Sequence, residues 1–543
     1  EQLTGVLPKD YTMFSDELLG ELLRIFNNNA LDEVGGDVIG RIYEYFLNKF
    51  AKNIAQDDGV FFTPKSLVKM IVNVLEPSGG VLLDPACGSG GMFVQTGDFV
   101  NAAGIEANSA MTFYGQEKVE YNAKLCLMNM AVHGLNGIIK SGDEANTFYH
   151  DAHNLDGCCD YVMANPPFNV DKVNAESAQS AGRLPFGLPG INKSKEFSNA
   201  NYLWISYFYS YLNETGRAGF VMASSATDSA NKDRDIRQKL VETGHVDVMV
   251  SVGNNFFYTK SLPCSLWFFD KGKKADLQDK VLFLDARNYY TVVDRTLNEW
   301  SEWQLKNLNA IVWLYRGEVE KYQNLLAEYM RRIKSFVTFI VDFQTGTLEL
   351  EMLPDFYREA NAQGRKLKEK AAQISSLNAC VEIQQMLDDY LRLQKAAATK
   401  FADYLEENKL KTVVKELIAS RAGRGPARVQ WYVKELNGVI SSHEQSICEC
   451  LNIVKEAQWL YEKFGEGEYQ DIPGLCKVAT RAEIAEKNYS LTPGAYVGVA
   501  AAEDDGVDFT QRMGEIHREL LKLQETSNAL METISKNLKE MGL

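Results

Sequence analysis

The chain has 543 residues, with 57 Lys and Arg against 73 Asp and Glu and a formal net charge of −16. This length predicts two or three domains with enough apolar material for their cores. The acidic balance argues against a chain that coats nucleic acid unaided, so an action on DNA would need positive surface from a partner.

Nine cysteines without a C-x-x-C spacing fit a reducing compartment and predict neither disulfides nor a metal site. A run of 18 or more apolar residues and a signal peptide are both lacking, so we expect a cytoplasmic protein without membrane contact. The first residue is Glu1 and not Met, and we expect that the true beginning is missing.

Residues 1–60 are predicted to be helical. Ser15 is placed to cap a helix that carries Leu18, Leu22 and further apolar residues. A second helix is expected over residues 37–50, with Ile42, Phe46 and Leu47 on one face. We expect both helices to pack onto the following domain.

A glycine-rich turn follows a short apolar strand at residues 81–94. Gly88, Gly90 and Gly91 permit positive φ and close approach of a ligand to backbone amides at a helix N-terminus. The turn matches neither phosphate-binding fingerprint and contains no lysine to hold phosphates. It therefore suits a ligand without a pyrophosphate, such as S-adenosylmethionine.

Three further features flank this turn in the sequence. Thr63 and Pro64 predict an N-cap and first helical residue upstream. Downstream, a strand over residues 112–116 leads to Glu117, where this fold usually places an acid against ribose hydroxyls. The next strand ends near Asp143, which is placed to accept from the amine of a cofactor adenine.

The strand that begins at Asp160 stops in the stiff turn Asn165-Pro166-Pro167-Phe168, because proline cannot donate to a sheet. Ligands of open α/β sheets bind at such carboxyl ends of strands. The Asn165 side chain and the Pro166 carbonyl can accept from an NH2 group, and Phe168 can stack on its ring.

The ordered motifs FFTP, DPACGSGG, YGQE, SGD and NPPF resemble the modification subunit of type I restriction–modification systems, within the N6-adenine DNA methyltransferases of the gamma arrangement. The resemblance implies an α/β fold with a Rossmann-like methyltransferase sheet, and S-adenosylmethionine as cofactor. The residues that it places at the cofactor are Phe62, Thr63, Asp84, Pro85, Ala86, Cys87, Gly88, Ser89, Gly90, Glu117 and Asp143. It makes Asn165, Pro166, Pro167 and Phe168 the catalytic turn.

The chemistry of adenine agrees with these roles. Its amino lone pair is delocalised into the ring, and two acceptors fixed on the NH2 hydrogens would draw the nitrogen toward sp3 geometry for attack on the sulfonium methyl. Neither a covalent nucleophile nor a metal is needed. The base must first leave the duplex, and Phe168 would replace part of its lost stacking.

Residues 171–199 read as a long polar loop, of the kind that is often functional or disordered. Later strands alternate with helices, and Phe256, Phe257 and Tyr258 are candidates for lining the base pocket, although aromatic residues of a core need no such role. The methyltransferase domain is expected over residues 61–315, with helical hairpins over residues 316–480.

The last region, residues 481–543, ends in a helix with a heptad seam, whose residues are Met513, Ile516, Leu520, Leu523, Leu530, Ile534 and Met541, interrupted by Ser527 and Asn537. This seam either packs on its own domain or, as the resemblance implies, docks on a DNA-specificity subunit. The resemblance further implies duplex DNA, a second copy of the chain and a restriction subunit as partners. Open alternatives are methylation of a protein glutamine or an RNA base, and an assembly scaffold without turnover.

Overall fold

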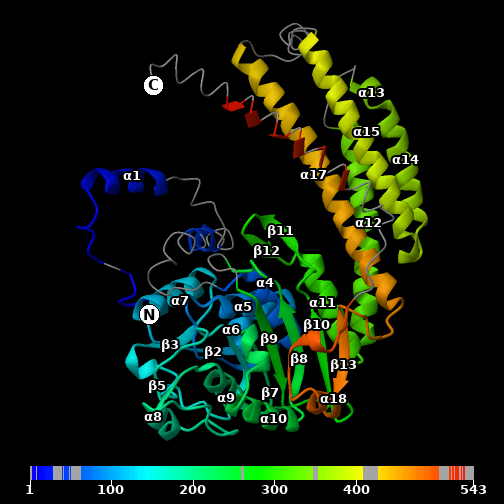
Figure 1. Cartoon of the computed structure of the whole chain (residues 1–543). Helices are drawn as coiled ribbons and strands as arrows, with labels where there is room; N and C mark the ends of the chain where they lie inside the picture. The colour runs from blue at the N-terminus through cyan, green and yellow to red at the C-terminus, as the bar shows by residue number, and fades with distance from the viewer. Residues whose placement is uncertain are drawn as a thin grey trace. The chain divides into compact units, whose positions relative to one another are not determined.

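The computed structural model describes residues 3–7, 9–27, 40, 42–47, 49, 63–257, 262–346, 353–407 and 426–499, and part of 513–531. The chain divides into two compact units, Glu1–Gly498 and Val499–Leu543. The first unit contains the sheet and a long helical region (Figure 1). Within the described ranges, no helix is long and apolar enough to cross a membrane.

The described part of the first unit contains a nine-stranded sheet in the order β13-β10-β8-β9-β7-β4-β1-β2-β3. Its strands are β1 (Gly80–Asp84), β2 (Met111–Glu117), β3 (Gly137–Ser141), β4 (Cys159–Ala164), β7 (Leu212–Ala223), β8 (Val246–Val252), β9 (Cys264–Asp270), β10 (Lys280–Asp285) and β13 (Cys476–Thr480). All except β9 and β13 run in one direction. The predicted α/β fold is confirmed.

The sheet is buried on both faces. Neighbouring residues of one strand belong to different cores: Leu82 faces one core and Leu83 the other. The first core takes in α4 (Lys65–Leu75), α5 (Gly91–Ala102), α7 (Glu120–Val132) and α11 (Glu302–Tyr315), and the second takes in α9 (Asn201–Tyr211), α10 (Lys232–Glu242) and α18 (Arg481–Glu486). Helices on both faces explain why β8 and β9 are buried along their whole length.

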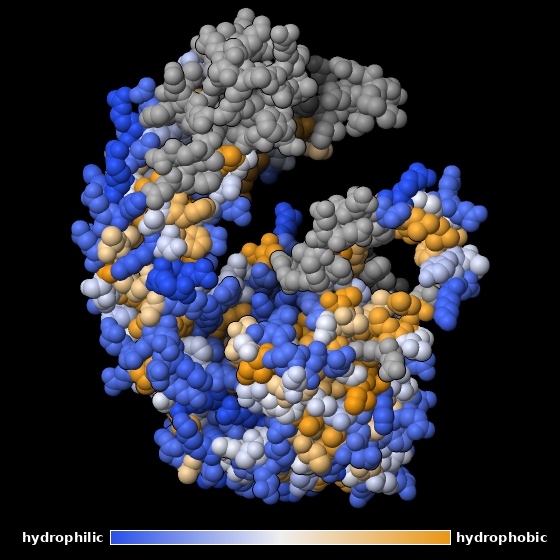
Figure 2. Space-filling model, turned by 180° about the vertical axis from the view of Figure 1, so that it is seen from behind, coloured by the Kyte–Doolittle hydropathy of each residue, from blue (hydrophilic) through white to orange (hydrophobic). Residues whose placement is uncertain are grey.

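The N-terminal helix α1 (Asp16–Phe26) begins where the sequence predicts. Ser15 is its N-cap, and the Ser15 hydroxyl accepts from the Leu18 amide. The expected packing is wrong for its apolar face, because Leu18, Leu23 and Ile25 are exposed. Figure 2 shows orange, hydrophobic surface among the hydrophilic surface of the N-terminal segment. Of the second expected helix, residues 40, 42–47 and 49 are described and are helical, and residues 37–39, 41, 48 and 50 lie outside the described ranges.

Long helices dominate residues 316–480, as predicted. They are α12 (Val319–Gly346), α13 (Leu353–Phe356), α14 (Arg358–Gln373), α15 (Cys380–Glu407) and α17 (Pro426–Phe464). Their apolar stripes bury Tyr329, Leu387 and Tyr390 in a core that continues into that of the sheet. The region ends in a strand, since β13 pairs antiparallel with β10 as the edge of the main sheet. The domain boundaries themselves stay predictions.

The loop over residues 171–199 is built from short elements. It contains β5 (Val173–Asn174), α8 (Ala175–Ser180) and β6 (Glu196–Phe197), and β5 pairs antiparallel with β6. Buried Arg183 donates to the Tyr211 hydroxyl at 2.6 Å and to the Thr147 carbonyl at 2.9 Å. The segment therefore contains short paired and helical elements where the sequence predicts a long polar loop.

In the second unit, the described residues between 513 and 531 are helical. Met513, Leu520, Leu523 and Leu530 of the predicted seam are exposed. Ile516, Ile534, Asn537 and Met541 lie outside the described residues. The role of the seam in docking stays a prediction.

Candidate active site

Three predicted site residues end neighbouring parallel strands. Asp84 ends β1, Glu117 ends β2, and Asn165 follows the last residue of β4. Strand β1 pairs with β2 on one side and with β4 on the other, so all three residues lie at the carboxyl edge. The chain passes from β1 to β2 and β3 on one side of β1 and then returns to β4 on the other side. This reversal of strand order is the switch point at which open α/β sheets bind ligands.

The glycine-rich turn between β1 and α5 has the backbone that its sequence predicts. Gly88 and Gly90 have φ values of +51° and +80°, and Gly90 is the N-cap of α5. The Cys87 amide donates to the Gln116 carbonyl at 3.0 Å, which fastens the turn to β2. A Cβ on Gly90 would lie 2.7 Å from Cys126 Sγ, so the turn also packs closely on α7.

Glu117 is joined directly to this turn. One carboxylate oxygen accepts from the Gly88 amide at 3.0 Å and the other from the Val119 amide at 2.8 Å. Burial raises the pKa of Glu117, and the two amides oppose that shift. The acid and the glycine turn, predicted separately, therefore form one continuous lining at the ends of β1 and β2.

Asp84 is the most deeply buried acid of this edge, with 2% of its surface exposed. Its carboxylate accepts from the Ala86 amide at 3.0 Å. Burial raises the pKa of Asp84 to about 8, the Ala86 amide opposes the shift, and the nearby Glu117 carboxylate adds to it. Among the described residues, neither Asp84 nor Glu117 forms an ion pair with a basic side chain. Two buried acids with raised pKa values therefore favour a ligand that carries positive charge.

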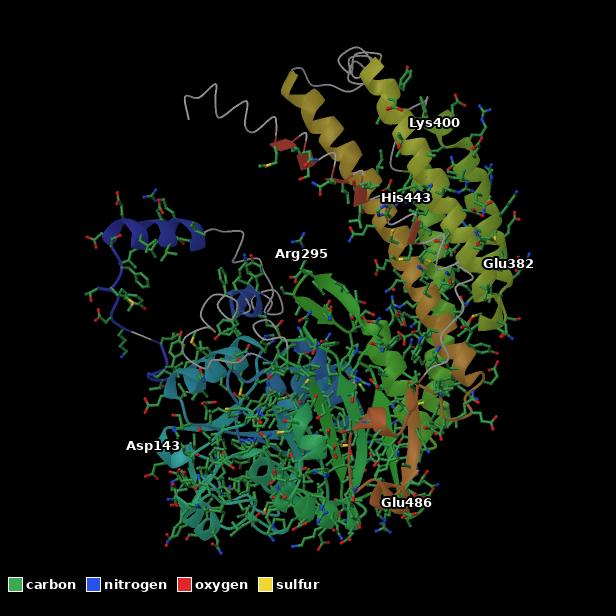
Figure 3. All side chains as sticks on the ribbon, viewed as in Figure 1. Asp143, Arg295, Glu382, Lys400, His443 and Glu486 are labelled. Carbon is green, nitrogen blue, oxygen red and sulfur yellow. The ribbon has the colours of Figure 1, made fainter. Side chains whose placement is uncertain are left out.

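Asp143 lies one strand farther along the same edge. It opens the short helix η1 (Asp143–Ala145) after β3, and it is exposed (Figure 3). The preceding Gly142 amide donates to the Glu117 carbonyl at 3.1 Å. Asp143 therefore follows directly on a residue that is hydrogen-bonded to Glu117. A contact between Asp143 and a cofactor stays a prediction.

A buried glutamine organises this edge. Gln116 is fully buried, and its side-chain amide donates to the Ala145 and His150 carbonyls and to the Thr147 hydroxyl, at 3.1 to 3.3 Å. Thr147 in turn donates to the Pro85 carbonyl at 2.5 Å. Gln116 is not among the predicted site residues. The only signal for it in the sequence is its position next to Glu117.

Thr63 and Asn165 meet across 102 residues of sequence. The Asn165 side-chain nitrogen donates to the Thr63 hydroxyl at 3.0 Å. The prediction that Thr63 caps a helix is wrong: Pro64 is the N-cap of α4 and makes no side-chain capping bond. The Thr63 hydroxyl instead accepts from Asn165 in the turn after β4, and Phe62 lies outside the described residues.

This hydrogen bond fixes which end of the Asn165 amide is available. Asn165 Oδ1 is buried and, among the described residues, has no hydrogen-bond partner. A buried acceptor without a partner is unfavourable, by roughly 1 to 3 kcal/mol, unless a ligand satisfies it. The site therefore presents one unused acceptor at the end of β4.

The rest of the turn presents an aromatic ring. Pro166 is buried, Pro167 is exposed and Phe168 is half-buried. The Phe168 ring meets the Phe257 ring at right angles, with centroids 6.2 Å apart. Beyond Phe168, the Asn169 amide donates to Asn201 Oδ1 at 2.9 Å, and the Asn201 side chain returns a bond of the same length, which locks the turn.

The three further candidates for the base pocket differ in their surroundings. Phe257 contacts Phe168, and its role in a base pocket stays a prediction. Phe256 is wholly buried against Tyr290 and Trp300, so a pocket role for Phe256 is wrong. Tyr258 lies outside the described residues. Adjacent residues point in opposite directions here, and the sequence alone cannot tell which one faces the ligand.

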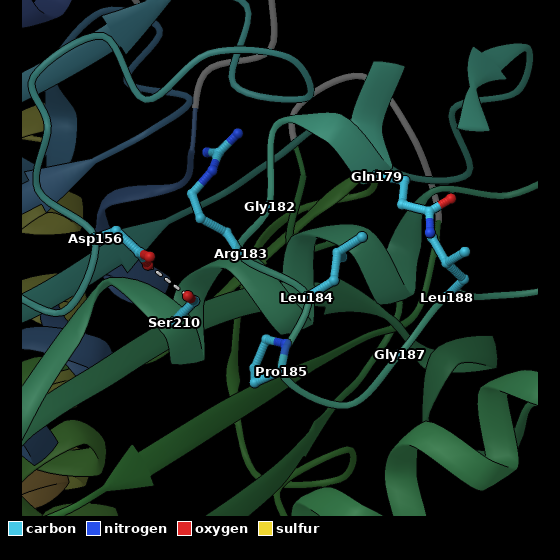
Figure 4. A pocket seen from close by; sticks show the side chains of 9 residues that line it. All are labelled: Asp156, Gln179, Gly182, Arg183, Leu184, Pro185, Gly187, Leu188 and Ser210. Carbon is cyan, nitrogen blue, oxygen red and sulfur yellow. Dashed lines mark hydrogen bonds between the residues drawn. The ribbon is translucent and has the colours of Figure 1, made fainter. Parts of the chain in front are cut away.

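A pocket on the described surface is distinct from this site. Figure 4 shows its lining residues, which are Asp156, Gln179, Gly182, Arg183, Leu184, Pro185, Gly187, Leu188 and Ser210. Asp156 precedes β4 and Ser210 precedes β7, so this pocket lies at the amino edge of the sheet, opposite Asn165. It therefore takes no part in the candidate active site.

Comparison with known proteins agrees with the motifs. The model of the N-6 DNA Methylase family matches residues 34–329. The methylase subunit of the type I restriction enzyme MjaIX of Methanocaldococcus jannaschii is 40% identical over 273 residues, which cover 50% of this chain and 48% of that protein. The methylase subunit of the enzyme HindI of Haemophilus influenzae is 33% identical over 313 residues, covering 55% and 68%.

A solved structure is also similar, the type I restriction–modification methyltransferase subunit from Streptococcus thermophilus. It has 22% identity and a TM-score of 0.44, and the match covers 51% of this chain and 57% of that one. The chain spans about half the length of the MjaIX relative, at 48%. The resemblance to type I methylase subunits is confirmed, and the chain belongs to the N-6 DNA methylase family.

Proposed function

We propose that the chain transfers a methyl group from S-adenosylmethionine to the amino nitrogen of an adenine flipped out of duplex DNA. The observation that carries this proposal is the Asn165 amide, whose nitrogen is bound to Thr63 and whose oxygen is buried without a partner among the described residues. The buried Asn165 oxygen can accept a hydrogen bond, and the adenine amino group is a donor.

The turn supplies the remaining contacts to the base. The Pro166 carbonyl is the second acceptor for the amino group, and two acceptors localise the nitrogen lone pair for attack. Phe168 stacks on the flipped ring, while the edge of Phe257 supports Phe168 from the side. The chain thus binds and orients the base without a covalent bond to it.

The carboxyl edge fits S-adenosylmethionine as cofactor, which would supply an electrophilic methyl group on a sulfonium. Gly88 and Gly90 bring backbone close to a ligand at the start of α5. Glu117 and Asp84, whose pKa values are raised by burial, would be favoured in their ionised forms by a cationic molecule, and the turn has no lysine for phosphates. Phe62, Thr63 and Asp143 complete the set that we assign to the cofactor, together with the residues of the glycine turn.

The partners are proposed from charge and from the relatives. With a net charge of −16, the chain needs positive surface from elsewhere to hold duplex DNA. Its relatives are named as subunits of type I restriction enzymes. We therefore assign sequence recognition to a specificity subunit bound through the C-terminal helices, in an assembly with a second copy of this chain and with a restriction subunit.

The test is the identity of the methylated product. The chain is co-expressed with and without its neighbouring genes, incubated with labelled S-adenosylmethionine and unmethylated genomic DNA, and the DNA is digested to nucleosides for mass spectrometry. We expect labelled N6-methyladenine, and only when the partner is present. Label in protein or RNA, or transfer to DNA that needs no partner, would contradict the proposal.

A further inference from the structure

A small β-ribbon stands apart from the main sheet at its carboxyl edge. It consists of β11 (Thr291–Asp294) and β12 (Leu297–Glu299), which pair only with each other among the described strands. The ribbon follows β10, a strand parallel to β8, and so it rises from the edge that carries Asn165. Figures 1 and 3 show it projecting beyond the sheet, with Arg295 at its turn.

The root of the ribbon is joined to the loop after β8, residues 253–257. Asn298 of β12 donates its backbone amide to the Asn255 carbonyl at 2.7 Å and its side chain to the Asn254 carbonyl at 3.0 Å. Phe256, with 0% exposure, packs on Trp300, at 4.8 Å between ring centroids. The next residue is Phe257, which contacts Phe168. Two side chains of one short loop thus connect the ribbon to the catalytic turn.

The tip of the ribbon is exposed in spite of this rigid root. Val292 and Val293 are 64% and 50% exposed, and the pairing of β11 with β12 shifts register between Val292 and Asp294, as at a β-bulge. Asp294 Oδ1 accepts from the Thr296 amide at 2.8 Å and from its hydroxyl at 2.9 Å, which closes the turn. Arg295 is exposed and makes no ion pair with any described residue. A tip with a hydrogen-bonded turn, two exposed apolar side chains and an exposed cation is suited to binding a partner that has both apolar surface and negative charge.

We propose that this ribbon inserts Val292 and Val293 into the duplex beside the target adenine, where they fill the space that the flipped base leaves, while Arg295 contacts a phosphate. This inference rests on the proposed function. A base delivered onto Phe168 comes from a duplex lying over the same edge, and the contacts of Asn298 and Trp300 hold the root of the ribbon at that edge. Apolar side chains wedged between base steps offset the cost of unstacking.

DNA is the partner that this placement favours. A protein bound on the ribbon tip would cover the approach to Phe168 and Phe257 and would compete with the duplex. A duplex, by contrast, must come within reach of both features at once. The cation at the turn matches a phosphate, and the valines match the apolar faces of the bases exposed by unstacking.

The test uses the complete complex and a duplex that carries its mapped methylation site. The variant Val292→Ser/Val293→Ser and the variant Arg295→Gln are compared with the control Val381→Ser, a valine 57% exposed on α15. Methyl transfer is measured on the paired duplex and on one with an abasic position opposite the target adenine. In the second duplex the target adenine is already unpaired, so flipping it costs less free energy and an inserted side chain should matter less to the rate.

We expect the double valine variant to lose about 10- to 100-fold in rate on the paired duplex, as for a few kcal/mol of unstacking, and to recover within about threefold on the abasic duplex. Arg295→Gln should weaken DNA binding and reduce its salt dependence. The control should match the wild type on both duplexes, and cofactor affinity should be unchanged throughout.

Equal losses on both duplexes, no loss on the paired duplex, or failure of the variants to assemble with the partner would overturn the role of the ribbon. These results leave the proposed function intact, because the wild-type complex still forms N6-methyladenine. Absence of that product from the wild-type reaction would instead overturn the proposed function and the ribbon with it.

Discussion

Asn165 donates to the Thr63 hydroxyl at 3.0 Å, and this single bond decides the chemistry that the turn after β4 can offer. While the Asn165 nitrogen donates to Thr63, the Asn165 oxygen is buried and accepts no hydrogen bond from the described residues. Thr63, which precedes the N-cap of α4, and Asn165, which follows β4, are therefore joined although 102 positions separate them.

The first prediction concerns Thr63. Thr63→Val removes the acceptor for the Asn165 nitrogen and leaves a donor unsatisfied, which costs about 1 to 3 kcal/mol and frees the amide to rotate. We expect kcat to fall about tenfold or more, with DNA affinity little changed. Thr63→Ser, which keeps the hydroxyl, should retain most of kcat. Equal kcat in the valine and serine variants would show that the hydrogen bond has no part in catalysis.

The second prediction separates two adjacent glycines. Gly90→Ala places a Cβ 2.7 Å from Cys126 Sγ at a φ of +80°, and we expect it to lower the free energy of unfolding by about 1 to 2 kcal/mol. Gly91→Ala meets no atom within 4 Å and should leave it nearly unchanged. The midpoint of chemical unfolding of both variants measures the difference. Equal midpoints would mean that the turn is not strained as described.

The third prediction concerns pH. The pKa of Asp84 is raised by burial to about 8, so this carboxyl is protonated near neutrality in the free protein. A cationic cofactor favours the ionised form, and binding should therefore release a proton below pH 8. We expect affinity for S-adenosylmethionine to rise from pH 6.5 to 8, by up to about tenfold per pH unit, and then to level off. Calorimetry in buffers of different ionisation enthalpy measures the proton.

The same pKa fixes the sign of its effect on folding. Because the folded value lies above the ordinary 3.8, Asp84 favours the folded state most at low pH, and this contribution is lost as the pH rises toward 8. Asp84→Asn should flatten both the stability profile and the affinity profile over this range. An affinity that keeps its full pH dependence in Asp84→Asn would assign the proton to another group.

The fourth prediction contrasts two neighbouring phenylalanines. Phe257→Ala removes the edge contact to Phe168, worth about 0.5 to 1.5 kcal/mol, and should raise the KM for DNA; because Phe257 is only 9% exposed, it should also lower folding stability. Phe256→Ala empties a core position and should cost about 3 to 5 kcal/mol of stability. Thermal unfolding and steady-state kinetics of the two variants distinguish these roles. A stable Phe256→Ala variant would contradict the packing of the ribbon root.

Local patterns predicted the features that depend on local chemistry. The glycine turn, the acid that ends β2 and the stop of β4 at Asn165 all follow from what Gly, Glu and Pro do to a backbone, and the structure has each of them. Ser15 as a helix cap is of the same kind. The fold class followed from the alternation of strands and helices.

Features that depend on distant partners were not predictable in the same way. Thr63-Pro64 has the pattern of an N-cap, but its hydroxyl is used by Asn165, which only the fold brings near. Strand β13 completes the sheet after a long run of helices, because β10 offers it an unpaired edge. Gln116 and the order of Phe256 and Phe257 likewise depend on neighbours from other parts of the chain.

The most direct test of the account is methyl transfer by Asn165→Ala in the complete complex. Labelled S-adenosylmethionine and the mapped duplex are supplied, and cofactor binding is measured in parallel by calorimetry. We predict a loss of transfer of at least about 100-fold, as for removal of a transition-state hydrogen bond in a dry site, with cofactor affinity unchanged. Full turnover by Asn165→Ala would contradict the central claim that the Asn165 oxygen positions the reacting amine.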